Sequence, residues 1–248
     1  MAIFVFFVAH HYLSLFAQSF FHHRYAAHRM FTMSRGWEKF FSIFSYIAQG
    51  SSYLSPRAYG IMHRMHHAHA DTEHDVHSPK HDKSIMKMMW RTKVIYSDIF
   101  WGRVKVDPKF TKGVPTWMAL EKWAERWPSR VLWGLLYVAF YYYFATAWWM
   151  WLFLPIQLVM GPVHGAIINW FAHKYGYTNY KTKDTSKNLF PVDVIMLGES
   201  LHNNHHKFGG RAKFATKWFE FDPVYPIIWL LDRVNVIQLR RSKPTVAF

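Results

Sequence analysis

The chain has 248 residues, enough for one domain or at most two. It contains no cysteine, which excludes disulfides, iron–sulfur clusters and thiolate nucleophiles, so any metal ligands must come from histidine, aspartate and glutamate. Aromatic residues make up 20% of the sequence, and the formal net charge is +15 with histidine neutral. Tryptophan and tyrosine favour membrane interfaces, and long uncharged runs make an anionic membrane face a better partner for this charge than nucleic acid.

The first 21 residues carry no lysine, arginine, aspartate or glutamate, and about 20 apolar residues suffice to cross a bilayer. The segment lacks the basic start and the small-residue cleavage site of a signal peptide. We therefore predict a retained transmembrane helix from Met1 to Phe21. A histidine pair, His23 and His28, follows directly. Because residues five apart on an α-helix differ in direction by about 140°, the two are not expected to share a helix face.

A second uncharged run, Phe40 to Pro56, is diluted by glutamine, glycine and serine, and it predicts an interfacial or re-entrant helix. It leads into the motif His63-Arg64-Met65-His66-His67. Three histidines at i, i+3 and i+4 lie on one face of a helix. Residues 80–130 are basic and mixed, with five tryptophans spread through them, which predicts a soluble cap that lies on the membrane surface.

Residues 131–171 contain no lysine, arginine, aspartate or glutamate. This run is about twice as long as one bilayer crossing requires, so it predicts two helices joined by a tight turn near residues 145–149. Both ends then lie on one side of the membrane, and the first helix enters from the other side. The many lysines and arginines in 22–130 and 174–248 place those parts in the cytoplasm. The tail, 211–248, predicts one further interfacial helix that is too short to span.

The densest polar motif lies at residues 198–206. It again holds histidines at i, i+3 and i+4, namely His202, His205 and His206. Asn169 and His173, four residues apart, stand at the cytoplasmic end of the long uncharged run. Neutral imidazole is a common ligand for iron, copper, zinc and nickel. One such motif is equally compatible with ordinary surface histidines, but three motifs hold more imidazoles than one ion needs and predict a shared site for two metal ions.

These motifs, in this order, resemble the histidine boxes of the membrane fatty acid desaturases, most closely the Δ9 acyl-CoA and acyl-lipid group that includes stearoyl-CoA desaturase. The three boxes stand at 23–28, 63–67 and 199–206. Asn169-Trp170-Phe171-Ala172-His173 is similar to the Asn-x-x-x-His element of the family, and Asp75-Val76-His77-Ser78-Pro79 is similar to the segment that follows its second box. Each box is weak evidence alone, whereas the ordered set is specific.

The resemblance implies a single desaturase domain over residues 1–248, with two iron ions as cofactors, O2 as co-substrate and no catalytic side chain outside the metal centre. Asn169 would hold one iron through a bound water. Nine histidines would be direct ligands, with their division between the two irons left open: His23, His28, His63, His66, His67, His173, His202, His205 and His206.

For the fold, the resemblance implies an all-α integral membrane protein with about three transmembrane helices, interfacial helices and a cytosolic helical cap that holds the histidines. The family usually has four spans, and this chain starts where its second would begin. The expected location is a bacterial inner membrane or its equivalent, with the active site on the cytoplasmic side. Apolar residues of the first helix and of 131–171 are expected to line a tunnel for the substrate.

For the reaction, the resemblance implies an oxygen-dependent enzyme that introduces a cis double bond, of Δ9 type, into a long-chain fatty acyl substrate. The acyl carrier is left open between CoA, a lipid and a carrier protein, because Ile61 and Met62 stand where CoA-linked members carry polar residues. The sequence shows no dinucleotide fingerprint and no haem domain, so a ferredoxin, a flavodoxin or a b-type cytochrome would dock on the basic face and supply electrons.

Two alternatives stay open at the level of sequence. A di-iron membrane hydroxylase would use a similar centre but insert oxygen instead of removing a second hydrogen. A histidine-rich metal transporter belongs to another class. It would place its ligands in the middle of the membrane, whereas most of the nine histidines lie outside the uncharged runs.

Overall fold

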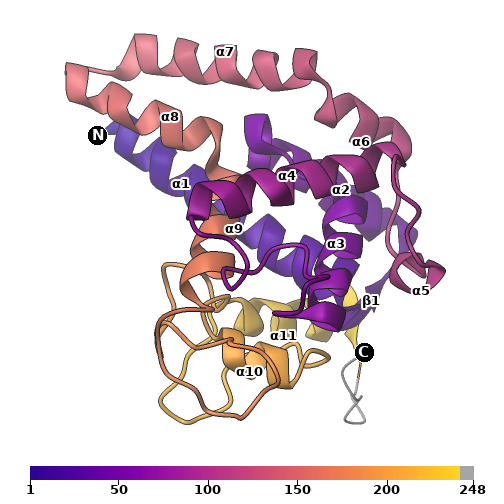
Figure 1. The fold of residues 1–248 in the computed structure, drawn as a ribbon. Coiled ribbons are helices and arrows are strands. Elements are labelled where there is room, and N and C mark those ends of the chain that lie inside the picture. The colour runs from indigo at the N-terminus through magenta and orange to yellow at the C-terminus, as the bar shows by residue number, and fades with distance from the viewer. Residues whose placement is uncertain (241–248) are drawn as a thin grey trace.

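The computed structural model describes residues 1–240, and these residues form a mainly helical molecule (Figure 1). The chain begins with α1 (Ala2–Phe16), which continues without interruption into a π-helical segment, η1 (Ala17–Ala27). Together they form one apolar helix over Ala2–Ala27 that is long enough to cross a membrane. The predicted first transmembrane helix is therefore supported by length and composition, and it runs further than the prediction, into the first histidine pair.

The π-helical segment corrects our expectation for His23 and His28. The backbone N–H of His28 donates to the carbonyl of His23 at 3.1 Å, so the chain closes i→i+5 turns here instead of i→i+4 turns. A wider turn brings residues five apart nearly above one another. The predicted divergence of about 140° applies only to an α-helix. In the structure the two imidazole rings are neighbours, with centroids 5.1 Å apart.

A short two-stranded sheet and an amphipathic helix follow. β1 (Phe31–Met33) pairs in antiparallel register with β2 (Ile237–Leu239) near the end of the described chain. The helix α2 (Arg35–Gln49) begins at Ser34, whose side chain accepts a hydrogen bond from the Trp37 N–H. Its exposed apolar side chains recur every three or four residues and so lie on one face: Trp37, Phe40, Ile43 and Ile47. This one-sided pattern supports the predicted interfacial helix.

The second histidine motif lies on α3 (Pro56–His69), which packs against η1 and follows the 3-10 turn η2 (Gly50–Ser52). Gly60 permits this close approach, because a Cβ atom at that position would lie 3.2 Å from the backbone of Ala26. Arg64 holds the two helices together. It donates to the carbonyls of Ala26 and Ala27 at 2.9 Å and 2.6 Å, and so satisfies backbone groups that the end of a helix leaves unpaired.

The predicted cap is formed by α4 (Ile85–Trp101), α5 (Pro108–Thr111) and α6 (Met118–Glu125). A buried apolar cluster joins α4 to α3, with members Ile61, Tyr96, Ile99 and Phe100. In Figure 1, α4 crosses the molecule on the side of α3, and α6 leads into the long helix α7 (Trp127–Phe144). The cap is thus packed directly on a histidine-bearing helix.

The long uncharged run turns where the sequence predicts, but its second half is not one helix. After α7, the turn at residues 145–147 leads into η3 (Trp148–Leu152) and α8 (Phe153–Leu158). The chain then bends by 70° before α9 (Met160–Ala166) and the π-helical η4 (Ile167–Phe171). Pro162 explains the bend, because proline has no N–H to donate to the carbonyl of Leu158. That carbonyl accepts instead from the Ser51 hydroxyl, at 3.0 Å.

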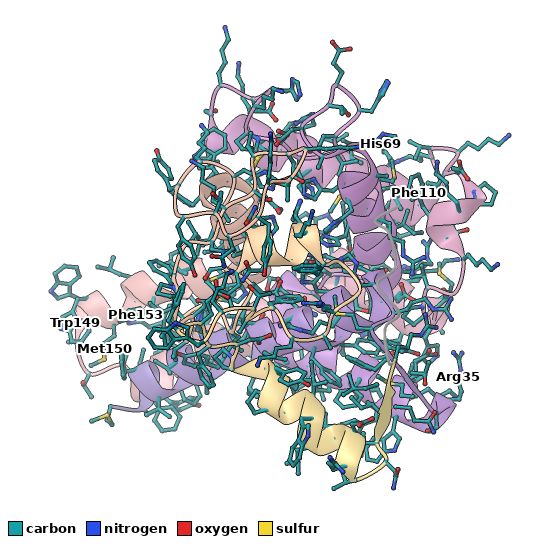
Figure 2. All side chains as sticks on the ribbon, turned by 90° about the horizontal axis from the view of Figure 1, so that it is seen from below. Arg35, His69, Phe110, Trp149, Met150 and Phe153 are labelled. Atoms are coloured by element: carbon teal, nitrogen blue, oxygen red, sulfur yellow. The ribbon has the colours of Figure 1, made fainter. Side chains whose placement is uncertain are left out.

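The number of spans is supported only in part. Over residues 1–240, the helix Ala2–Ala27 meets the length and hydropathy expected of a span, and the bent pair Trp148–Leu158 and Met160–Phe171 would count as a second. The tyrosines and tryptophans of α7, together with Arg130 in its first turn, lower its hydropathy below that of a span. In Figure 2, Trp149, Met150 and Phe153 form one tip of the molecule, and Arg35 lies on the opposite side.

The last part of the chain wraps around the end of η1. The third histidine motif lies on the short helix α10 (His202–Lys207), and a cluster of buried apolar residues packs η1 against α11 (Val224–Arg233). With ten residues, α11 is too short to span a bilayer, and it exposes Trp229 and Leu230, as expected of an interfacial helix. The rest of the predicted tail, 241–248, lies outside the described residues. The all-α prediction therefore holds apart from the β1–β2 pair.

Candidate metal centre

All nine histidines predicted as ligands meet at one place, although they come from separate segments of the chain. They form two groups, and within each group the nearest ring nitrogens all lie within 4.8 Å of one another. The first group, called here the five-histidine group, contains His23, His28, His63, His67 and His205. The second, the four-histidine group, contains His66, His173, His202 and His206.

The ring nitrogens face one another in a way that hydrogen bonding alone does not explain. Nε2 of His205 lies 2.9 Å from Nε2 of His23 and 3.0 Å from Nε2 of His67. In the other group, Nε2 of His173 lies 3.1 Å from Nε2 of His202. A neutral imidazole carries one N–H and one lone pair, so such clusters hold more facing nitrogens than protons to share among them. A shared cation satisfies all the lone pairs at once.

Two buried nitrogens make the same point for the four-histidine group. Nε2 of His66 and Nε2 of His206 are buried and meet no hydrogen-bond partner among the described residues. Each ring is held through its other nitrogen by a carboxylate: Nδ1 of His66 lies 2.9 Å from Asp75, and Nδ1 of His206 lies 3.0 Å from Asp184. This arrangement fixes the tautomer and directs the free Nε2 lone pair inward, as metal-binding histidines require. The residues present therefore fit a metal ion.

Each of the two i, i+3, i+4 motifs contributes to both groups. On α3, His63 and His67 are four residues apart and share the five-histidine group, whereas His66 belongs to the other. On α10, His202 and His206 are four apart and share the four-histidine group, whereas His205 belongs to the other. Residues four apart differ by only about 40° around a helix, so these pairs converge, and the remaining histidine is turned toward the neighbouring site. The i, i+3, i+4 spacing thus builds two adjacent sites.

A buried network of charged side chains holds His23, a member of the five-histidine group, in place. Nδ1 of His23 is hydrogen-bonded to Glu199, and Arg24 donates to the same carboxylate at 2.8 Å. Nη2 of Arg24 also donates to both carboxylate oxygens of Asp222, at 2.9 and 3.1 Å, and the guanidinium lies 3.8 Å from the ring centroid of Phe214. Gly198 lies at φ +89°, and a Cβ there would collide with Asp222. The chain can therefore turn into Glu199 only through glycine.

The electrostatics of the site favour the neutral form of several of these imidazoles. Burial, followed by the charges of neighbouring histidines, holds the pKa values of His63 and His205 well below the ordinary range. Burial lowers the pKa of His206 to about 4, although its hydrogen bond to Asp184 acts in the opposite direction. Burial alone would raise the pKa of Asp75, but the charge and hydrogen bond of His66 bring it below its usual value. At neutral pH the lone pairs of His63, His205 and His206 are consequently available to a metal.

Several supporting residues were not predicted. Asp184 and Thr185 come from the irregular segment between η4 and α10, and the Thr185 hydroxyl lies 3.3 Å from Nδ1 of His173. Asp71 accepts from the Thr185 hydroxyl at 2.8 Å. No spacing pattern marks these residues, because their distance along the chain from the histidines is set by the loop. Asp75 and Glu199 belong to quoted motifs and could have been proposed as partners of histidine.

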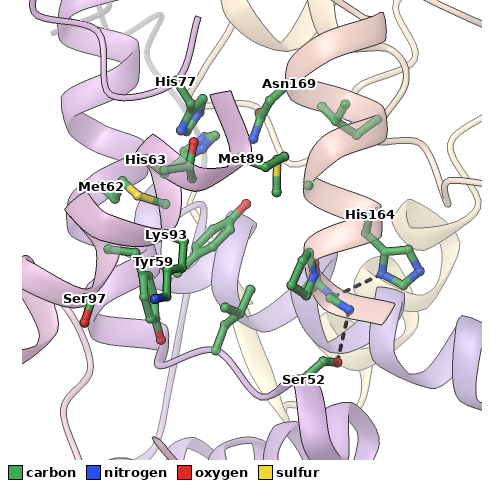
Figure 3. A pocket seen from close by; sticks show the side chains of 18 of the residues that line it. Ser52, Tyr59, Met62, His63, His77, Met89, Lys93, Ser97, His164 and Asn169 are labelled. Atoms are coloured by element: carbon green, nitrogen blue, oxygen red, sulfur yellow. Dashed lines mark hydrogen bonds between the residues drawn. The ribbon is translucent and has the colours of Figure 1, made fainter. Parts of the chain in front are cut away.

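A cavity of about 900 Å³ opens onto the centre. Its walls come from α1 and η1, α3, α4 and the α9–η4 segment, and it extends to the junction of α6 and α7. Its lining includes histidines of both groups, His23, His63 and His202, and Figure 3 shows His63 on its wall. Leu15 and Ile168 match the predicted lining from the first helix and from 131–171. Met89, Trp90 and Tyr96 of α4 do not, because that helix was assigned to the cap.

Asn169 also lines this cavity, on η4 and four residues before His173. Its role as a ligand through water stays a prediction. The assignment of the nine histidines as iron ligands is likewise a prediction, which their convergence supports.

Comparison with known proteins agrees with the motifs. Residues 1–232 match the family described as fatty acid desaturase. Delta-9 acyl-lipid desaturase 1 of Arabidopsis thaliana is 29% identical, covering 87% of this chain and 67% of that protein. Delta-9 desaturase-like 5 protein of the same plant is 30% identical, covering 87% and 68%. The sn-1 stearoyl-lipid 9-desaturase of Anabaena variabilis is 29% identical, covering 85% and 73%. With histidines of both groups lining one cavity and a family match over residues 1–232, the protein belongs to the fatty acid desaturase family.

Proposed function

We propose that the protein uses O2 and two iron ions to introduce a cis double bond, of Δ9 type, into a long-chain fatty acyl substrate. The observation that carries this proposal is that histidines of both groups, His23, His63 and His202, line one cavity of about 900 Å³. Its volume lies within the usual range of small-molecule sites, about 300–1,000 Å³. Overall, CH2–CH2 plus O2, two electrons and two protons gives CH=CH plus two water molecules.

The protein residues would position the substrate and the metal. Five histidines would hold one iron and four the other. Asn169 would hold the iron of the four-histidine group through a bound water. Iron would supply what side chains lack, the reduction of O2 and the removal of hydrogen from an unactivated methylene. Apolar residues such as Leu15, Met89 and Ile168 would align two neighbouring methylenes with the centre and exclude water.

The carrier and the electron donor are part of the proposal. The relatives named acyl-lipid or stearoyl-lipid desaturases favour a lipid-linked chain, and CoA or a carrier protein is the alternative. The chain has 30 lysines and arginines and 15 acidic residues, and this positive net charge favours docking of an acidic ferredoxin, flavodoxin or b-type cytochrome. We place the protein in a bacterial inner membrane or its equivalent, with the basic segments and the metal centre on the cytoplasmic side.

About two iron atoms per chain are expected in protein purified from iron-replete cells, because the structure offers two nitrogen-rich groups side by side. Metal analysis combined with Mössbauer spectroscopy measures both the number and the nitrogen environment. Protein that binds a single iron, or none, while all nine histidines are intact would contradict the proposed centre.

The product is expected to be a cis-monounsaturated acyl chain and not a hydroxylated one. Both reactions begin by removing a hydrogen, so the outcome depends on how the cavity holds the second methylene against the centre. Gas chromatography with mass spectrometry of lipids from an expressing host distinguishes the two, with the empty vector as the control. Hydroxy acids as the main product, without a new alkene, would assign the protein to the membrane hydroxylases instead.

A further inference from the structure

His77 is buried beside the candidate metal centre but belongs to neither histidine group. Its side chain is 2% exposed, and it lines the cavity. Neither of its ring nitrogens has a hydrogen-bond partner among the described residues. The other buried histidines with an unpaired nitrogen, such as His66 and His206, have one each. His77 therefore offers two buried polar atoms that the site described so far does not use.

The ring of His77 is fixed in place next to the four-histidine group. Its backbone N–H donates to Asp75 Oδ1 at 3.0 Å, and the same oxygen accepts from Nδ1 of His66. The rings of His77 and His66 are stacked with centroids 4.4 Å apart. One carboxylate thus positions both a candidate ligand and the unpaired histidine. His77 is not a member of the four-histidine group, whose ring nitrogens lie close enough to share a cation.

Leaving a buried polar group unpaired is unfavourable, because the group loses its hydrogen bonds to water and gains none in return. A small polar ligand in the cavity would remove this cost for His77. Asn169 lies on the wall of the same cavity, where its amide can both donate and accept a hydrogen bond. Figure 3 shows His77 and Asn169 at the same end of the cavity, close to His63, with Met89 just below them. The two side chains together offer donors and acceptors to a ligand in an otherwise largely apolar space.

We propose that His77 is a positioning residue that, together with Asn169, holds a water molecule at the cavity face of the four-histidine group. This inference rests on the proposed function, because the water would occupy the side of the metal that faces the substrate. Hydrogen bonds from two side chains would fix the position of this water. The fixed water would couple the reduction of O2 to the oxidation of the acyl chain, so that each O2 consumed yields one double bond. Without it, part of the O2 would take two electrons from the carrier and two protons and leave as H2O2.

The test uses the iron-loaded enzyme with its electron donor and compares His77→Phe with His77→Gln. Phenylalanine keeps the planar ring but removes both nitrogens, whereas glutamine retains a hydrogen-bonding group. We expect all variants to keep about two irons per chain. The number of double bonds formed per O2 consumed should fall about tenfold or more in His77→Phe, with H2O2 released, and be partly restored in His77→Gln. His74→Phe, at an exposed position in the same loop, is the matched control.

A double-mutant cycle makes the assignment specific. If one water joins the two side chains, combining His77→Phe with Asn169→Leu should lower the yield per O2 no further than either change alone, and all three variants should share one altered Mössbauer spectrum. Additive effects, a wild-type spectrum and yield in His77→Phe, or loss of iron from it would each overturn the proposal. Failure of the wild-type protein to bind two irons or to form a double bond would instead refute the proposed function.

If His77→Phe does not fold, the same cycle is run with His77→Leu, and His77→Gln again serves as the conservative variant. Leucine also removes both nitrogens but fills less of the cavity than phenylalanine. We expect His77→Leu to show the same fall in yield per O2, and a wild-type yield in this variant would overturn the role of His77.

Discussion

Replacing His206 with alanine is expected to abolish desaturation. His206 belongs to the smaller, four-histidine group, and its Nδ1 is held by Asp184 at 3.0 Å so that Nε2 points inward. The variant leaves three histidines for that metal and a space where the ring stood. Because losing only an outer partner of a ligand costs about 10–100-fold, losing the ligand itself should cost at least about 100-fold. Fatty-acid profiling of an expressing host measures the activity, and metal analysis should show iron falling toward one per chain.

His74→Ala is the matched control for His206→Ala. His74 is an exposed histidine between the second box and His77, and it belongs to neither group. It should therefore leave both the iron content and the product profile at wild-type levels. Wild-type amounts of double bonds in His206→Ala, at equal protein abundance, would show that the four-histidine group is not needed for the reaction.

Replacing Arg24 with alanine should destabilise the fold strongly. The Arg24 side chain is fully buried, and it holds Glu199 and Asp222 through charge-assisted hydrogen bonds. Alanine would leave two buried carboxylates without their cation, and breaking a buried ion pair costs about 3–5 kcal/mol. His23 would suffer as well, because Glu199 also holds its Nδ1. We expect a large fall in the midpoint of thermal unfolding in detergent and a reduced iron content.

Arg35→Ala serves as the comparison for Arg24→Ala. Arg35 pairs with Glu38 within α2, but its side chain is 63% exposed. Exposed pairs of this kind contribute about 0–1 kcal/mol, because water already solvates both charges. The unfolding midpoint should therefore barely move. Equal losses from the two arginine variants would mean that the buried network around Arg24 does not stabilise the centre.

The histidine motifs were predictable because their geometry is local. On α3 and α10 the i, i+3, i+4 spacing alone places the rings on one side of the helix. The split into five and four was not predictable, since it depends on how α3, α10 and η1 approach one another. Asp184 illustrates the same limit. It reaches His206 across a loop whose path follows from the packing of the whole molecule.

The first histidine pair shows how a sequence rule can be applied correctly to the wrong helix type. His23 and His28 diverge on an α-helix but converge on η1, where backbone bonds close i→i+5 turns. A π-helix is rarely favoured by local sequence, so tertiary contacts must hold it. Arg64 from α3 supplies one such contact at its C-terminal carbonyls.

For the uncharged run 131–171, the predicted turn was correct, but the predicted second helix is broken into two segments by a bend. Hydropathy reports the length of an apolar segment and not its direction. Pro162 was visible in the sequence, yet a proline can either kink a helix or end it. In the structure the chain bends by 70° here, and the carbonyl of Leu158 accepts a hydrogen bond from Ser51, 107 residues earlier in the chain.

By itself, the sequence determined the ligand types, the helices that carry them, the apolar character of the first helix and the family. These properties depend on residue chemistry, on short spacings within each motif, on the length of the first apolar run and on the order of the motifs along the chain. Only the tertiary structure decided how His23 and His28 share a site, which histidines form each group, and that α4 lines the cavity. It also left both ring nitrogens of the buried His77 without a hydrogen-bond partner among the described residues. These outcomes depend on contacts between residues far apart in the chain, whose relative positions are set by the packing of helices as whole bodies and not by any local pattern.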